Sequence, residues 1–203
     1  LLVSAIIFAG WGDAYGAGLN TDVALTPPKG GTIVRGQWRY SELGNDPTGM
    51  GREVRLSVQP VTVVHGITEN LAVLGTVPII YREIEFGSGQ TKHDSGVGDI
   101  PLLAKYRFFQ DDQPGKTTRW AAIGGLEVPT FDDAFSSESF DPIIGTVWTH
   151  QELDWWVDWD VLYQFNTGSG ADRDDLLRGD VALSYRLLGG ESEAIGPWGL
   201  YAI

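Results

Sequence analysis

The chain has 203 residues, a formal net charge of −13 at pH 7 and no cysteine. The lack of cysteine excludes a disulfide scaffold and a zinc–cysteine cluster, and the negative charge argues against nucleic acid as a partner, because binding phosphates needs a basic face. No run of 18 or more apolar residues follows the N-terminus, which excludes helical membrane spans.

The first ten residues, LLVSAIIFAG, are typical of the apolar core of a secretory signal peptide, with Ala14 and Gly16 as the small residues before a cleavage site at Ala17. We therefore expect residues 1–16 to be the remnant of a signal peptide and residues 17–203 to be the mature domain. A first strand or a buried segment is the alternative. The chain starts at Leu1 without a basic region, so we expect truncation there, and an incomplete strand count predicts truncation at the C-terminus as well.

Period-two alternation of apolar and polar residues, interrupted by segments rich in Gly, Pro and Asp, predicts nine strands. In chain order they cover residues 32–42, 52–64, 69–84, 98–109, 118–130, 142–150, 153–166, 176–188 and 197–203.

The strand at 153–166, LDWWVDWDVLYQFN, is the most informative of them. Trp155, Trp159 and Tyr163 share one face, whereas Asp158 and Asp160 share the other. When tilted, about 9–11 residues are enough to cross a hydrocarbon core. A strand this long, with one unbroken apolar and aromatic face, predicts contact with membrane lipid.

The predicted connections alternate in length. They are short after strands 52–64 and 142–150, and long and polar after strands 69–84, 118–130 and 153–166. Short turns at one end and long loops at the other are typical of outer-membrane barrels. The sequence therefore predicts an all-β fold, a transmembrane antiparallel up-and-down barrel, with about 9 strands in this chain.

Four segments resemble one family: GVGDIPLLAKYRFF, GGLEVPTFDD, the strand rich in Trp and Asp, and LLRGDVALSYRL. The motif residues are Gly96, Gly98, Asp99, Lys105, Tyr106, Glu127, Pro129 and Thr130. The chain is similar to the outer-membrane transporter family named for the MetA-pathway of phenol degradation. The resemblance implies a barrel of about 12 strands in the bacterial outer membrane, and passive uptake of small, often aromatic or apolar solutes. It implies no mechanism at the level of single residues.

The polar faces of the strands supply candidates for a solute path through the lumen. They are Arg35, Arg39, Arg55, Asp99, Lys105, Arg107, Glu127, Trp156, Asp158, Asp160, Arg178, Asp180 and Arg186. A charged constriction sorts solutes by field and hydrogen bonding. The alternative is a lattice of ion pairs that fills a narrow barrel. Trp156 could stack on a solute or fill the core.

Pro101 and Pro129 fall near the ends of neighbouring predicted strands, where proline cannot donate to a ladder. They indicate either a lateral gap through which an apolar solute reaches the lipid or ordinary strand ends.

Signals for catalysis are weak. The three histidines lack metal-ligand spacing, and no nucleophile elbow, Walker loop or dinucleotide fingerprint occurs. We expect no enzyme activity, no metal and no cofactor. The expected partners are outer-membrane lipid and a small solute; the sequence predicts no oligomeric state. The alternatives are a non-conducting structural barrel, a lipid-modifying outer-membrane enzyme with a spatially assembled triad, and a secreted β-sandwich that binds glycans.

Overall fold

The computed structural model describes residues 2–10, 22–44, 51–130, 134–168, 174–188 and 200–202. These residues form one eleven-stranded sheet in which every pair of neighbouring strands is antiparallel. Within the described residues, no helix is long and apolar enough to cross a membrane. The strands are β1 (Leu2–Gly10), β2 (Thr32–Leu43), β3 (Glu53–Gly66), β4 (Leu71–Glu85), β5 (Thr91–Val97), β6 (Ile100–Gln113), β7 (Lys116–Val128), β8 (Asp141–Glu152), β9 (Trp155–Gln164), β10 (Leu176–Leu188) and β11 (Leu200–Ala202).

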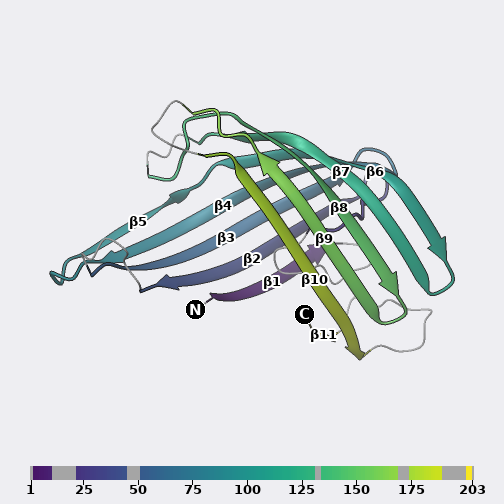
Figure 1. The fold of residues 1–203 in the computed structure, drawn as a ribbon, viewed down its shortest axis with the longest axis horizontal. Coiled ribbons are helices and arrows are strands. Elements are labelled where there is room, and N and C mark those ends of the chain that lie inside the picture. The colour runs from purple at the N-terminus through teal and green to yellow at the C-terminus, as the bar shows by residue number, and fades with distance from the viewer. Residues whose placement is uncertain are drawn as a thin grey trace.

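Strands that follow one another in sequence lie side by side, with β5 attached to one end of β4 (Figure 1). The sheet curls into a half-barrel, which confirms the predicted all-β up-and-down architecture. Because all described strands belong to one sheet, a sandwich of two stacked sheets is wrong for this part of the chain.

The two ends of the half-barrel differ in their connections. At the short-turn end, residues 67–70, 114–115 and 153–154 join β3 to β4, β6 to β7 and β8 to β9. At the long-loop end, the connections after β7 and β9 are longer, and β4 continues into the hairpin with β5. The predicted short turns and the long connections after β7 and β9 are therefore confirmed, whereas the loop predicted after residue 84 contains β5.

The two faces of the sheet have opposite chemistry, and the apolar face is the exposed one. On β10, Val181 is 78% exposed, whereas Asp158 and Asp160 on the neighbouring β9 are each 1% exposed. Exposed apolar side chains cover the convex face, and buried polar ones line the concave face. A water-soluble sheet shows the reverse arrangement.

Three differences from the sequence-based prediction have a clear physical reason. Residues 91–97 form β5 inside a predicted loop; their side chains are mostly polar, so no apolar alternation marks them. The hairpin of β6 and β7 extends to Gln113 and Lys116, because backbone pairing continues through polar residues. Leu153 has φ 53° in the turn between β8 and β9, so the strand predicted from residue 153 begins at Trp155.

The structure also pairs residues 2–10 with β2 as strand β1, from Leu2↔Ser41 to Gly10↔Ile33. This is the alternative interpretation of the apolar N-terminal segment. Residues 11–17, which include the proposed cleavage site, lie outside the described residues, so the removal of a signal peptide stays a prediction.

Candidate functional site

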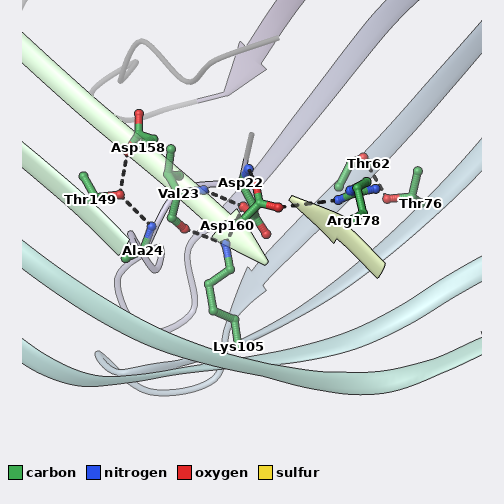
Figure 2. Close-up of polar contacts among 10 residues, drawn as sticks. All are labelled: Asp22, Val23, Ala24, Thr62, Thr76, Lys105, Thr149, Asp158, Asp160 and Arg178. Atoms are coloured by element: carbon green, nitrogen blue, oxygen red, sulfur yellow. Dashed lines mark hydrogen bonds and ion pairs between the residues drawn. The ribbon is translucent and has the colours of Figure 1, made fainter. Parts of the chain in front are cut away.

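A segment near the N-terminus occupies the concave face of the half-barrel. Residues 22–24 lie between β6 on one side and β8 and β9 on the other, and side chains from all three strands bind them (Figure 2). We call residues 22–28 the inner segment. Its neighbours include several of the predicted lumen residues.

Lys105 of β6 binds the inner segment through two short contacts. Its Nζ lies 2.6 Å from Oδ1 of Asp22 and 2.7 Å from the carbonyl oxygen of Val23. The Lys105 side chain is only 2% exposed. Lys105 therefore has a buried positive charge whose ion-pair partner is the carboxylate of Asp22, and buried charges require such a partner.

The opposite wall holds the backbone of the same segment. The N–H of Asp22 donates to Oδ2 of Asp160 at 2.7 Å, and the N–H of Ala24 donates to Oγ1 of Thr149 at 2.9 Å. The Thr149 hydroxyl in turn donates to Oδ1 of Asp158 at 2.6 Å. Asp158 and Asp160 are thus both part of the wall that holds this segment.

An apolar patch adjoins these polar contacts. The methyl group of Ala24 is fully buried among Ala121, Ile123 and Val147, with Leu103 and Leu162 packed around them. The concave face therefore combines a cation, hydrogen-bond acceptors and an apolar patch within one small region.

Arg107 lies on the same face toward the short-turn end. Its Nη2 donates to the carbonyl oxygen of Glu69 and to Oδ1 of Asn70, both at 2.8 Å. The hydroxyl of Thr26 also donates to the Glu69 carbonyl, at 2.7 Å. Arg107 and the inner segment therefore both hold the turn between β3 and β4.

Acidic residues lie on the concave face toward the long-loop end. Oε2 of Glu127 accepts from Nε2 of Gln164 at 2.5 Å. Asp99, between β5 and β6, accepts from the N–H groups of Thr130 and Ser137 at 3.0 and 2.7 Å. Partial burial opposes ionisation of Asp99, but hydrogen bonds from Ser137 and Thr130 outweigh it and lower the pKa of Asp99. Asp99 thus anchors the loop after β7.

The remaining candidates lie across β2, β9 and β10. Nε of Arg178 lies 3.0 Å from Oδ2 of Asp180, and its Nη2 lies 3.9 Å from Oδ1 of Asp160. Arg39 donates to Oε1 of Gln37 at 2.7 Å, and its neighbour Arg35 also belongs to the concave face. Trp156 is 2% exposed on the inner side of β9. The side chain of Arg186 lies outside the described residues.

Several buried polar atoms on this face lack a hydrogen-bond partner within the described residues. They include Oδ2 of Asp158, Oδ1 of Asp160 and Oγ of Ser184. Buried polar groups in proteins are nearly always paired, with ordered water if not with protein. These atoms of the concave face can therefore form further hydrogen bonds, with water or with a polar solute.

The prediction that Arg55 lines the lumen is wrong. The register pairs it with Glu42 on β2 and Glu83 on β4, whereas Arg35 pairs with Thr62. Residues 55 and 62 are an odd number apart, so Arg55 lies on the convex face. Nη1 of Arg55 is 2.6 Å from Oε1 of Glu83. Near this end of the sheet the polar face of β3 is the convex one, and Val54 and Leu56 lie on the other face, so alternation does not by itself identify the lumen side.

The two prolines do not open a gap between β6 and β7. Their ladder runs from Ile100↔Val128 to Gln113↔Lys116, and Pro101 lies opposite Glu127 within it. Pro129 follows the end of β7. The interruption lies on the other edge of β6, because β4 pairs with β6 only up to Gly75 and with β5 only from Ile79.

Sequence patterns did not predict the inner segment. Residues 22–28, DVALTPP, show no strand or helix periodicity. The available signal was the pair of cations on the inner face of β6, Lys105 and Arg107, because a cation buried there requires a partner. Among the described residues, no group of three or more His, Asp or Glu is arranged to hold a metal ion; the expectation of a metal-free protein stays a prediction.

Comparison with known proteins identifies the family. No curated protein and no solved structure matches the chain. The model of the family described as "Putative MetA-pathway of phenol degradation" matches residues 47–197. This range includes β3 to β10, and with them every barrel strand whose side chains bind the inner segment. The chain therefore belongs to the family of the MetA-pathway of phenol degradation.

Proposed function

We propose that this protein is an outer-membrane β-barrel that admits small, apolar or aromatic solutes by passive diffusion along its concave face. The observation that carries the proposal is the inverted burial: Lys105, Asp158 and Asp160 are buried while Val181 and Leu183 are exposed. In a membrane, contact between the exposed apolar face and lipid is favourable, and the polar concave face lines a lumen. Family membership supports the substrate class.

The proposal places the convex face against lipid and the long-loop end outside the cell. Trp120, Trp148 and Trp159 form an aromatic cluster on the convex face, with ring centroids 6.0 and 6.3 Å apart. These rings add to the apolar band that faces lipid on the outside of a membrane barrel. The protein acts without metal or cofactor in this proposal and catalyses no reaction.

The membrane location is tested by extraction. The full-length protein should sediment with outer membranes, require detergent for release, and migrate faster on an unboiled gel than after boiling. Release by salt or alkaline carbonate alone would contradict a membrane-spanning barrel.

Conduction is tested by swelling of liposomes that contain the folded protein. Benzyl alcohol, glycerol and sugars of increasing size form the panel, and the aromatic solute should enter fastest relative to its size.

The inner segment fills part of the concave face, and this favours a non-conducting barrel as the second candidate.

One substitution separates the two candidates. Ala24 is fully buried in the apolar patch, so Ala24→Trp should displace the inner segment. A channel should then pass solutes several-fold faster, whereas a structural barrel should pass none. Lys29→Trp is the matched control, because Lys29 is exposed.

A further inference from the structure

We propose that Lys105, Thr149 and Asp160 form a binding subsite for small aromatic carboxylates, and that the side chain of Asp22 occupies this subsite as a tethered competitor. The inference rests on the proposed channel function and deepens it by naming a ligand class. It follows from the contacts of the inner segment, because a free solute can reproduce the ion pair with Lys105 and the packing on the apolar patch.

The first element of the subsite is the cation. Nζ of Lys105 is buried and lies 2.6 Å from a carboxylate oxygen of Asp22. The same Nζ also contacts the carbonyl oxygen of Val23 at 2.7 Å. Lys105 thus binds two oxygens of one short segment, in a region where its charge is shielded from water.

The second element is the apolar patch beside the cation. The side chain of Ala24 covers it, packed against Ala121, Ile123 and Val147. A carboxylate with a ring directly attached would place its charge on Lys105 and its ring on this patch. An aromatic ring buries more apolar surface there than the single methyl group of Ala24.

The third element is a pair of acceptors on the opposite wall. Asp160 accepts the N–H of Asp22, and Thr149 accepts the N–H of Ala24. Both acceptors become available when the inner segment leaves. A ring substituent that donates a hydrogen bond, such as a hydroxyl group, would restore one of these contacts.

The charge balance selects the ligand class. When a solute carboxylate replaces that of Asp22, the number of charges around Lys105 stays the same. A neutral solute in the same place would remove the carboxylate that lies 2.6 Å from Nζ of Lys105 and leave only the more distant carboxylate of Asp158 near this buried charge, which is unfavourable. Only an anionic head group therefore displaces the inner segment without this penalty.

Benzoate and its neutral analogue benzamide are the probes, measured by calorimetric titration of the full-length protein folded in detergent. A short tether gives Asp22 an effective concentration on the order of mM at Lys105. Asp22→Asn keeps the shape and backbone contacts but removes the competing charge. It should tighten benzoate binding about tenfold or more, since the competitor is lost, and benzoate should still bind more tightly than benzamide.

Two further variants complete the test. Asp22→Asn combined with Lys105→Gln should lose the preference for benzoate over benzamide. Lys116→Gln, at the exposed start of β7, should change neither affinity. The same proteins are then tested for benzoate and benzamide entry into liposomes.

The outcomes separate this inference from the channel proposal. Equal affinities of benzoate and benzamide for Asp22→Asn would overturn the subsite, even if both solutes enter liposomes. Benzoate-selective binding that depends on Lys105, without entry of any solute, would support the subsite and contradict the channel.

Discussion

Among the described hydrophobic residues, Val181 has the most exposed large side chain, at 78%, and it lies in the middle of β10. If the convex face meets lipid, arginine there costs about 2–4 kcal/mol, and about 0–1 kcal/mol near the membrane surface. Val181→Arg should therefore lower the free energy of unfolding far more than Leu177→Arg, on the same face near the end of the strand. Equilibrium unfolding in lipid vesicles measures both. Equal losses would place this face in water.

Lys105 and Asp22 should depend on each other for stability. Removing one partner of a buried pair costs about 3–5 kcal/mol, because the other charge stays behind unpaired. We expect Lys105→Met and Asp22→Asn each to destabilise the protein, and the double variant to be less destabilised than their sum. Chemical unfolding in detergent, followed by tryptophan fluorescence, measures the coupling.

The pair of Lys116 and Glu152 is the control for this cycle. Their side chains are 45% and 58% exposed, and the charged atoms are 3.8 Å apart. Exposed pairs contribute about 0–1 kcal/mol, so this cycle should show little coupling. Additive effects at Lys105 and Asp22 would mean that the inner segment is not bound in solution.

At single positions, alternation was a good guide where one face is buried and a poor one elsewhere. It assigned Lys105, Asp158 and Asp160 to the concave face, where the structure has them. It failed for Arg55, because at this end of β3 the charged residues lie on the convex face and Val54 and Leu56 lie on the other. The partner of Lys105 could not be identified, because Asp22 is 83 residues away and belongs to no periodic element.

Adjacent glycines on β7 test how closely strands approach one another. A Cβ on Gly125 would lie 2.1 Å from the carbonyl oxygen of Leu102, whereas a Cβ on Gly124 would meet only the carbonyl of Ile143, at 3.9 Å. Gly125→Ala should therefore destabilise the barrel by about 1–3 kcal/mol through overpacking. Gly124→Ala is the matched control and should be close to neutral. Thermal unfolding of both variants in one detergent decides the comparison.

At the level of strands, the sequence predicted the elements with clear alternation and missed those without it. The strand rich in Trp and Asp was found as β9, although its start shifted because Leu153 enters a turn with positive φ. The strand β5 was missed because Thr91–Val97 carries few apolar residues, and its pairing with β4 comes from backbone groups that sequence patterns do not show.

The charge of the whole lumen should set ion preference. Arg107 binds a carbonyl and an amide, neither of which cancels its charge, and it lies two residues from Lys105 on the same face. Neutralising both as Lys105→Gln and Arg107→Gln should shift the reversal potential toward cation preference in bilayer recordings under a salt gradient. An unchanged potential in a conducting variant would show that both residues serve only as structural contacts.

The control for the recordings carries the same change in charge at exposed sites. Lys92 and Lys116 are 62% and 45% exposed at opposite ends of the sheet. At physiological salt their field is screened within about 8 Å. Lys92→Gln combined with Lys116→Gln should therefore leave the reversal potential close to that of the original protein.

The position of the inner segment also sets an order of assembly. Asp22 and Asp160 are 138 residues apart, so their contact closes one of the longest loops in the chain, and such contacts form late. When the barrel has assembled as far as β6 but not β9, Lys105 is in place. The contact of the inner segment with Asp160 cannot yet form. The segment near the beginning of the chain is thus among the last to settle, and hydrogen exchange at the amides of Asp22 and Ala24 should slow only after β9 has joined the sheet.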